Sequence, residues 1–262
     1  MSAVPLSATI ITLNEEDTIQ RALQSLQWVQ EIIVVDSGSQ DNTRSVAAAN
    51  KAQVLHQDWL GYGQQKNFAQ SKTSHDWVLN IDADEMVPPE LAQWIQTKLS
   101  EFDTQVKSKP ESTPVGIAFP RKTFFMGQWI QHGGWYPNTV VRLTHKAYGK
   151  WTEPSVHEKL QVKGKIIQAP YPLHHYTFKN LQDQIQTNVI YSYRGYEQLQ
   201  KNGKTKSLIK LIFKPIGKFM ELYFLKRGFL DGYAGFIIAV NAAHSMFLKY
   251  AYFYDTSQET SK

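Results

Sequence analysis

Three carboxylates lie within four positions of one another in residues 80–85, which read Asn-Ile-Asp-Ala-Asp-Glu. The apolar run before them is typical of a buried strand, and Pro88 and Pro89 indicate that a helix begins just after them. Carboxylates crowded at the end of a strand repel one another unless a cation compensates their charge. Oxygen-rich sites suit Mg²⁺ or Mn²⁺, which commonly bind substrate phosphates as well. Asp82 and Asp84 are therefore candidate metal ligands, and a solvated acidic turn is the alternative.

Strand and helix patterns alternate in the chain around these carboxylates. Asn14 is expected to cap a helix with one apolar face, directly after the first strand. Such alternation predicts a doubly wound α/β fold, a mainly parallel sheet with helices on both faces, whose ligands lie at the carboxyl ends of the strands. Because Asp36, Asp82 and Asp84 all lie at such ends, a binding site is favoured over an acidic turn. The runs that predict these strands are 8–13, 31–36, 53–56 and 77–81.

The second half of the chain predicts two further strands and then a helical region. Residues 103–114 are polar and indicate an exposed connection, and strands are expected at 115–125 and 140–143. The loop 126–137 between these strands is rich in glycine and aromatic residues, whose flat faces suit a sugar ring. Helical periodicity returns at 181–200. We therefore expect one large domain at 1–178, with halves at 1–102 and 115–178, and a helical region at 179–262.

Positive charge is concentrated near the C-terminal end of the chain. Residues 201–228 contain eight Lys or Arg and a single acid, Glu221, and apolar residues lie between the lysines. Pro215 should kink or split the helix that this pattern predicts. The apolar stretch 233–248 is too short to span a bilayer, which takes about 20 residues, so an interfacial helix at an anionic membrane surface is the preferred interpretation. A basic helix packed on the domain and an RNA-binding face are the alternatives.

Composition sets wider limits on the class of protein. The hydrophobic fraction of 42% and the aromatic fraction of 13% are typical of globular chains. The absence of cysteine excludes disulfides, zinc–thiolate sites and thiol nucleophiles. The first five residues contain neither a basic nor an apolar leader segment, so we expect a cytoplasmic location.

Other phosphate-handling classes are disfavoured by their motifs. The chain has no G-x-G-x-x-G after the first strand and no G-x-x-x-x-G-K-[ST], which argues against dinucleotide dehydrogenases and P-loop NTPases. Phosphatases with an aspartyl nucleophile also use D-x-D. In them a Thr or Val usually stands two places after the second Asp, where this chain has Met86, and their motif follows the first strand instead of the fourth.

Three segments together resemble a known family. Residues 10–16 (Ile-Ile-Thr-Leu-Asn-Glu-Glu), 34–43 (Val-Val-Asp-Ser-Gly-Ser-Gln-Asp-Asn-Thr) and 80–85 are similar to the family-2 glycosyltransferases with a GT-A fold. Further segments resemble the bacterial lipopolysaccharide core glucosyltransferases that add a β-1,4-glucose to the inner-core heptose. These segments are 61–67, 124–127, 132–137, 156–158, 173–176 and 228–232, and the whole resemblance runs from about residue 6 to residue 250.

The resemblance implies roles for individual residues. In the nucleotide-sugar half, 1–102, Asp36 would bind the uracil of a UDP-sugar and Lys66 its base or diphosphate, while a turn-capping role better suits Asp41. In the acceptor half, 115–178, Glu158 would be the base that deprotonates the acceptor, with Glu153 in reserve. The choice between His174 and His175 as a late metal ligand stays open, with His175 preferred. The implied sets are Thr12, Asn14, Glu15, Asp36, Lys66 and Asp82 for the nucleotide-sugar, Asp82, Asp84 and His175 for the metal, and His132, Trp135 and Tyr136 for the acceptor.

The predicted activity is that of a metal-dependent, inverting glycosyltransferase. It would move a hexose, most simply glucose, from a UDP-sugar to the inner-core heptose of lipopolysaccharide, using Mg²⁺ or Mn²⁺. The expected location is peripheral, on the inner face of the cytoplasmic membrane beside a lipid-linked acceptor, with no nucleic acid as a partner. The alternatives are transfer onto a polyprenyl phosphate or another lipid-linked glycan, and a non-catalytic module that binds nucleotide-sugar or membrane.

Overall fold

The protein is described here by a computed structural model that covers residues 4–109, 111–153 and 158–255. Within these residues the chain forms two compact units. The first contains the chain up to Arg121 together with Asn138–Tyr176, and the second contains Lys122–Pro137 together with the chain from Thr177 onward. The segment 122–137, which we expected in the larger domain, therefore belongs to the helical unit. The boundary expected near residue 178 lies close to the start of the second unit's helical part.

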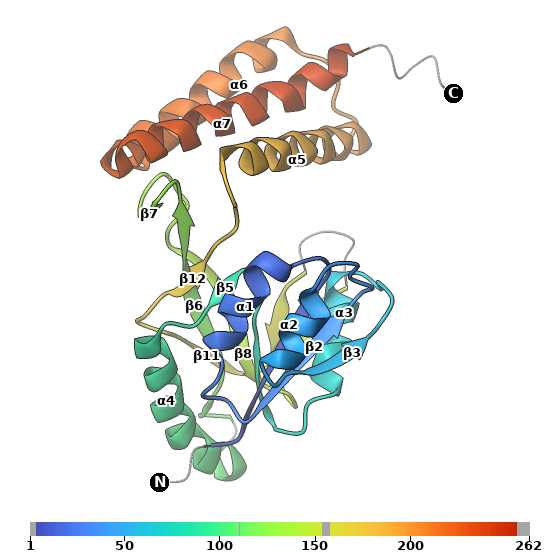
Figure 1. The fold of residues 1–262 in the computed structure, drawn as a ribbon. Coiled ribbons are helices and arrows are strands. Elements are labelled where there is room, and N and C mark those ends of the chain that lie inside the picture. The colour runs from blue at the N-terminus through green and yellow to red at the C-terminus, as the bar shows by residue number, and fades with distance from the viewer. Residues whose placement is uncertain (1–3, 110, 154–157, 256–262) are drawn as a thin grey trace. The chain divides into compact units, whose positions relative to one another are not determined.

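The first unit is built on a sheet whose N-terminal half is parallel (Figure 1). Its strands follow the order β3-β2-β1-β4, with β4 in register with β1 through Leu6–Trp77 and Thr9–Asn80. The sheet then continues through two antiparallel strands, β8 and β6. The bounds are β1 Leu6–Thr12, β2 Glu31–Asp36, β3 Gln53–His56, β4 Trp77–Asn80, β6 Pro114–Phe125 and β8 Asn138–His145.

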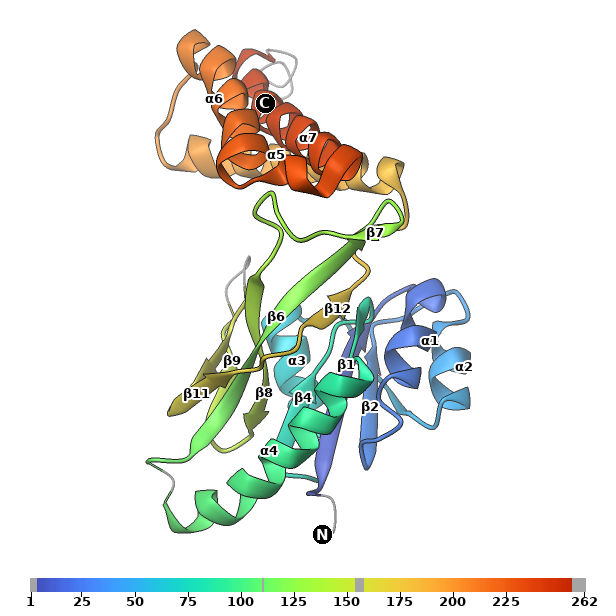
Figure 2. The ribbon, with the colours of Figure 1, turned by 90° about the vertical axis from the view of Figure 1, so that its left-hand side faces the viewer.

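Helices cover both faces of this sheet, as the alternation of side chains along a strand requires. Ala8 and Ile10 of β1 pack in the main core with the apolar faces of α1 and α4, whereas Ile33 and Val35 of β2 pack on the other face with α3. Figure 2 shows α4 and α3 on opposite sides of the strands. The helices are α1 Glu16–Gln24, α2 Thr43–Ala49, α3 Tyr62–Ser71 and α4 Pro89–Ser108. The predicted α/β class is confirmed.

Two local predictions in this unit are wrong. Helix α4 continues to Ser108, through much of the expected connection, because Phe102 and Val106 keep the apolar period and are buried in the core. Asn14 does not cap α1. Its backbone has a left-handed φ of 56°, and its side-chain oxygen accepts a hydrogen bond from the N–H of Gln40 at 2.9 Å. The N-cap position is taken by Glu15 instead.

Short strands surround the carboxylate segment. β5 (Glu85–Met86) pairs antiparallel with β12 (Leu173–His175), so His175 lies opposite Glu85. β9 (Gly149–Trp151) and β10 (Leu160–Val162) form a separate hairpin. β11 (Lys165–Gln168) runs parallel to β6. These strands place late parts of the sequence beside the end of β4.

The second unit consists of three helices and one aromatic loop. α5 (Leu181–Lys201) and α6 (Leu208–Met220) both pack on α7 (Gly232–Ala251), and β7 (Gln128–Trp129) pairs with the end of β6. A π-helical turn, Glu221–Leu225, and two 3-10 turns, Gly228–Asp231 and Tyr252–Tyr254, complete the unit. None of the helices in the described part of the chain is both long and apolar enough to cross a bilayer.

Pro215, which is expected to kink or split the helix, lies inside α6 and does not split it. Proline removes one backbone hydrogen bond and usually kinks a helix. Here α6 is continuous from Leu208 to Met220, and it packs along α7 over much of its length. We attribute the continuity to this packing, which holds the helix together across the missing bond.

Candidate functional site

The carboxylate segment is positioned at the end of β4 by buried hydrogen bonds. The side-chain oxygen of Asn80 accepts hydrogen bonds from the Thr9 hydroxyl at 3.0 Å and from the Trp151 indole at 3.2 Å. The turn that follows is closed twice, because the N–H of Glu85 donates to the carbonyl of Asp82 and the N–H of Asp82 donates to Glu85 Oε2, each at 3.0 Å. The three carboxylates are thus held in a rigid turn.

Arginine side chains supply the positive charge that these carboxylates need. Arg142, buried in β8, donates from Nη2 to Asp82 Oδ2 and, at 2.7 Å, to Glu85 Oε1. Arg121 Nη1 also donates to Glu85 Oε1, at 3.2 Å. Arg142 is not among the site residues expected from the sequence. A lone arginine in the apolar run 140–143 was the signal that could have found it, because a buried arginine requires an acidic partner.

Lys66 of α3 also belongs to the cluster, and it binds the oxygen of Asp82 that Arg142 does not bind. Its ammonium lies 3.1 Å from Asp82 Oδ1 and 3.0 Å from Glu158 Oε1, and only 6% of its side chain is exposed. It also lies 4.4 Å above the ring of Trp151, a cation–π contact. The structure therefore brings together three of the predicted residues, one each from the nucleotide-sugar, metal and catalytic sets.

The charges shift the pKa of Asp82. Partial desolvation disfavours its ionised form, but the charges of Arg142 and then of Lys66, with their hydrogen bonds, outweigh this and hold the pKa of Asp82 well below its usual range. Burial works against the charge of Arg142 as well, and Asp82 and Glu85 more than compensate, so the pKa of Arg142 is raised. Asp82 is therefore ionised at neutral pH, with both oxygens bound to cations of the protein.

Asp84 faces a different partner. Its Oδ2 lies 3.1 Å from Nε2 of His175, and its carbonyl accepts a hydrogen bond from the N–H of Tyr176 at 2.8 Å. The Asp84 side chain is 27% exposed, so its carboxylate is accessible to a ligand. His174, its neighbour in β12, is opposite Met86, and successive side chains of a strand point to opposite faces. His175 contacts the carboxylate segment through Asp84.

The expected nucleotide residues cluster at the ends of β1 and β2. Asp36 is fully buried and accepts hydrogen bonds from the backbone N–H groups of Gly38 and Ser39, both at 3.0 Å, so it caps its own turn as Asp41 caps the next one. Thr12 is buried beside it, and among the described residues its hydroxyl has no hydrogen-bond partner.

Asn14 and Glu15 follow directly on from β1. The N–H of Asn14 donates to the Ser39 hydroxyl at 2.9 Å, and the N–H of Glu15 donates to the Thr43 hydroxyl at 2.8 Å. The carboxylate of Glu15 accepts a hydrogen bond from the Thr18 hydroxyl at 2.6 Å. These bonds tie the two turns after β1 and β2 into one rigid rim.

The remaining candidates lie elsewhere. Glu153 is exposed and accepts hydrogen bonds from Asn67 at 3.0 Å and from Gln64 at 3.3 Å, so it faces α3 amides instead of Lys66. The three predicted acceptor residues belong to the second unit. Residues 156 and 157, which are part of a segment that supported the resemblance, lie outside the described residues.

The acceptor candidates form part of the loop that packs on the C-terminal helices. His132 Nδ1 lies 3.1 Å from Asp231 Oδ1, and the same carboxylate accepts a hydrogen bond from the His132 N–H at 2.7 Å. Trp135 packs with the rings of Phe125 and Phe178. Tyr136 is half-buried.

Comparison with known proteins identifies the family. Residues 7–134 match the model of the family described as Glycosyl transferase family 2. The chain is 32% identical over 264 residues to an uncharacterized glycosyltransferase of Rickettsia prowazekii, with 96% of this chain and 87% of the relative covered. The chain therefore belongs to the family-2 glycosyltransferases, and the predicted family and GT-A fold class are confirmed.

A second relative has a more specific description. The chain is 32% identical over 263 residues to the lipopolysaccharide core biosynthesis glycosyltransferase LpsC of Rhizobium meliloti, with 96% of this chain and 92% of the relative covered. Among solved structures, glucosyl-3-phosphoglycerate synthase from Mycobacterium tuberculosis in complex with Mn²⁺, UDP and glucosyl-3-phosphoglycerate has a TM-score of 0.34 at 27% identity, over 47% of this chain and 45% of that chain.

Proposed function

We propose that this glycosyltransferase moves a hexose, most simply glucose, from a UDP-sugar to a lipid-linked lipopolysaccharide core acceptor, with inversion at the anomeric carbon. The observation that carries the proposal is the set of groups at the end of β4: an accessible Asp84 beside His175, and Glu158 beside Lys66 and Asp82. The acceptor class is supported by the relative LpsC, which is a lipopolysaccharide core biosynthesis glycosyltransferase.

Asp84 and His175 form a pair of ligands that fits a divalent cation. A carboxylate oxygen and an imidazole nitrogen lie 3.1 Å apart, and among the described residues they are not part of any larger group of potential ligands. Mg²⁺ and Mn²⁺ commonly bind through one or two side chains and take their other ligands from substrate phosphates and water. The cation would neutralise the diphosphate that leaves. Asp82 would support this metal site indirectly, by holding the turn in place, because its own two carboxylate oxygens are bound by Arg142 and Lys66.

The rim after β1 and β2 is the proposed nucleoside site. The unsatisfied Thr12 hydroxyl suits a polar group of the ligand, because a buried hydroxyl without a hydrogen bond is costly. Asp36 is fully buried, and its carboxylate accepts hydrogen bonds from the turn 37–39. It would bind uracil only by giving up one of these hydrogen bonds. Asn14 and Glu15 would shape the rim through their backbone bonds.

Glu158 is the proposed base. Inversion requires a group that takes the proton of the acceptor hydroxyl as this oxygen attacks the anomeric carbon from the face opposite the leaving diphosphate. Glu158 lies beside the diphosphate-binding candidates, through Lys66, and 19% of its side chain is exposed to an incoming acceptor. Glu153 is less suitable because its two oxygens are bound by α3 amides. His132, Trp135 and Tyr136 stay the proposed acceptor residues, His132 oriented by Asp231.

The donor site is tested by calorimetric titration with UDP-glucose in Mn²⁺ and then in EDTA. We expect binding that depends on the metal and that Asp84→Asn reduces at least tenfold, because the variant loses a charged ligand. Asp76→Asn is the matched control: Asp76 pairs with Lys146 at the start of β4, away from the carboxylate segment. Metal-independent binding, or equal binding by both variants, would contradict the metal assignment.

The helical unit has the features of a membrane-binding surface. Helix α6 has no buried residue, although most of its residues are apolar. Ile209 is 71% exposed and Phe213 is 64% exposed. Large apolar side chains that face water in this number mark an interaction site, because their exposure is unfavourable. The other exposed apolar residues of α6 are Leu208, Ile212, Ile216 and Met220.

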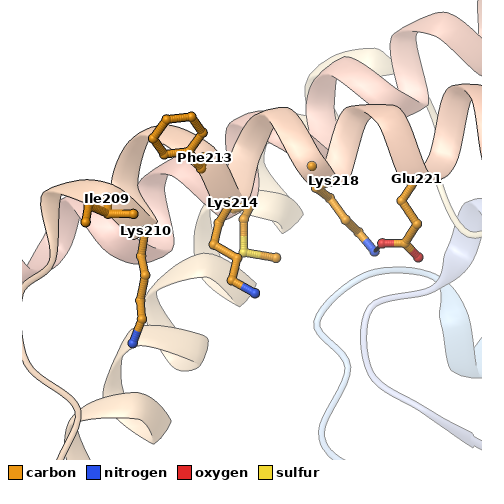
Figure 3. A pocket seen from close by; sticks show the side chains of 8 residues that line it. Ile209, Lys210, Phe213, Lys214, Lys218 and Glu221 are labelled. Atoms are coloured by element: carbon orange, nitrogen blue, oxygen red, sulfur yellow. Dashed lines mark hydrogen bonds and ion pairs between the residues drawn. The ribbon is translucent and has the colours of Figure 1, made fainter.

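Lysines beside these apolar residues indicate what the surface binds. Lys210, Lys214 and Lys218 recur at every fourth position and extend from one side of α6, whereas Phe213 points away from them (Figure 3). Together with Met246 of α7 they line a hollow of about 490 Å³. A row of ammonium groups beside apolar side chains complements the anionic headgroups and acyl chains of a bilayer surface. We propose that α6 attaches the enzyme to the leaflet that holds its acceptor.

Sedimentation with vesicles tests this attachment. The full chain should bind phosphatidylglycerol vesicles, and Lys210→Ala/Lys214→Ala should weaken binding about thirtyfold, because each lysine near an anionic surface contributes roughly 1 kcal/mol. Lys163→Ala/Lys165→Ala removes two exposed lysines of the first unit and serves as the control. If both double variants bind as the wild type does, α6 is not the attachment surface.

A further inference from the structure

We infer that Lys66 is an exchangeable counterion, which the donor diphosphate takes from Glu158 when it binds. This inference rests on the proposed donor site. In the structure the Lys66 ammonium is shared between Asp82 Oδ1 at 3.1 Å and Glu158 Oε1 at 3.0 Å, and it lies over the ring of Trp151. One cation thus links the turn that carries the metal-ligand candidates to the proposed base.

The charge balance of the cluster requires an exchange of this kind. Three cations, those of Lys66, Arg121 and Arg142, face three carboxylates, those of Asp82, Glu85 and Glu158. The cluster is therefore close to neutral by itself. The donor diphosphate brings two negative charges and Asp84 carries a third, so one divalent cation at Asp84 leaves one negative charge uncompensated. The ligand must then recruit a cation from the cluster, and the carboxylate that loses this cation must be one that water can solvate.

Only Lys66 has a partner that can be released in this way. Arg121 and Arg142 both bind Glu85, whose side chain is fully buried, so moving either arginine would leave a buried charge unpaired. Glu158 is 19% exposed and can turn toward solvent or toward an acceptor hydroxyl. A lysine also has a flexible four-carbon stem and a compact ammonium, which suits a change of partner better than the rigid fork of arginine.

The backbones on both sides of the pair are held in place, so the exchange involves side chains alone. Asn67 is the residue next to Lys66. Its side-chain amide accepts a hydrogen bond from the N–H of Trp151 at 2.9 Å and donates one to the carbonyl of Trp151 at 3.0 Å. After Glu158, the N–H of Lys159 donates to the Thr152 hydroxyl at 2.9 Å, and the carbonyl of Lys159 accepts from the Thr152 N–H at 2.9 Å.

The consequence is an order of events at the site. Without donor, Oε1 of Glu158 is occupied by the Lys66 ammonium and is not available to the hydroxyl of an acceptor. Once the diphosphate binds Lys66, the carboxylate is released beside the place where the sugar is transferred. Lys66 is thus a positioning residue that makes the base available only when the donor is bound. The acceptor should accordingly bind productively after the donor.

Titration with UDP in Mg²⁺ tests the exchange. Because Glu158→Gln removes a competitor for Lys66, we expect it to bind UDP about tenfold more tightly than the wild type does. Lys66→Met should bind UDP about tenfold more weakly, and Glu158→Gln should produce no gain in the Lys66→Met background. Glu153→Gln is the matched control on the same hairpin, because the Glu153 oxygens face Asn67 and Gln64. Uridine, which lacks the diphosphate, should bind Glu158→Gln and the wild type equally.

Each outcome separates this inference from the donor assignment. Equal UDP affinity of Glu158→Gln and the wild type would overturn the exchange while leaving the donor site in place. A gain that persists without Lys66, or that uridine also shows, would overturn the role of Lys66. Absence of UDP binding by the wild type would overturn the donor assignment itself, and this inference with it. If Lys66→Met does not fold, the comparison of Glu158→Gln with the wild type, using both UDP and uridine, still decides.

Discussion

The two units use positive charge in opposite ways. In the first unit, Lys66 and Arg142 are almost completely buried, and each is bound to two carboxylates. In the second unit, Lys210 and Lys214 lie on the surface of α6 among exposed apolar residues, with no acidic partner among the described residues. The buried charges of the first unit are paired with carboxylates of the same chain, whereas the lysines of α6 are available to a partner outside the chain.

The difference teaches where single substitutions should matter. Removing one partner of a buried ion pair leaves the other charge desolvated and unpaired, which costs several kcal/mol. Removing one charge from an exposed row weakens attraction to a charged surface in small steps that salt screens. We therefore expect large, all-or-none effects at the carboxylate turn and graded effects on α6. The predictions below test that contrast, from the largest effect to the smallest.

The largest effect is expected for Arg142→Met. The variant leaves Asp82 and Glu85 without their shared cation, and the free energy of unfolding should fall by about 3–5 kcal/mol. Denaturant unfolding curves measure this change, with Lys150→Met, at the exposed residue of β9, as the control. Adding Glu85→Gln to Arg142→Met should restore part of the loss. A drop below about 1 kcal/mol would show that the buried cluster is no more sensitive than the surface.

The same substitution at two glycines should have opposite results. A Cβ on Gly63, at the start of α3, would lie 1.9 Å from the carbonyl oxygen of Thr152, so Gly63→Ala must separate α3 from the hairpin that carries Glu158. We expect a loss of about 1–3 kcal/mol of stability and weaker UDP binding. Nothing lies within 4 Å of a Cβ on Gly217 in α6, so Gly217→Ala should raise stability by up to about 1 kcal/mol. Melting temperatures of the two variants measure the difference.

Phe213→Ser should separate membrane attachment from folding. Because Phe213 is 64% exposed, the free energy of unfolding should change by less than about 0.5 kcal/mol. Partition onto phosphatidylglycerol vesicles should fall about tenfold, since a phenyl ring that enters a bilayer surface is removed from water. Tyr171→Ser removes an exposed aromatic residue of the first unit and should change neither quantity. Loss of stability without loss of partition would reverse our assignment of α6.

The smallest effect is expected at Glu221, the only acid in residues 201–228. Hydrogen bonds from Lys226 and Lys218 lower the pKa of Glu221, so this group stabilises the fold above its unfolded pKa near 4, and the contribution is lost as the pH falls through its lower folded value. Since the groups are exposed, the contribution is small. Melting temperatures of the wild type and Glu221→Gln should therefore differ slightly at pH 7 and converge below about pH 3.

The same variant should bind anionic vesicles a few-fold more tightly. It removes one negative charge from the basic stretch and frees Lys218 and Lys226 to face the headgroups. Vesicle partition at pH 7 measures this gain. Weaker binding by Glu221→Gln would mean that the Glu221 pairs hold the surface in its binding conformation.

Much of the fold could be predicted because the relevant signals are local. The strands at 31–36 and 53–56, the start of α4 at Pro89 and the helix beginning at Leu181 follow from apolar period and proline placement. Where the structure differs from these local signals, packing overrides local preference. Phe102 and Val106 extend α4, and contact with α7 keeps α6 continuous through Pro215.

The residue types and their spacing by themselves determined the class of chemistry. Each of the features that indicate it is contained in one short stretch of sequence and can be recognised without the fold. They are a D-x-D after the fourth strand, an aspartate after the second strand and a basic, apolar segment near the end of the chain. The tertiary structure alone decided which groups meet. Arg142 reaches Asp82 across 60 positions and Lys66 reaches Glu158 across 92, because β8 runs antiparallel to β4 and the β9–β10 hairpin docks on α3. Ion pairing depends on distance in space, and separation along the chain does not reveal it.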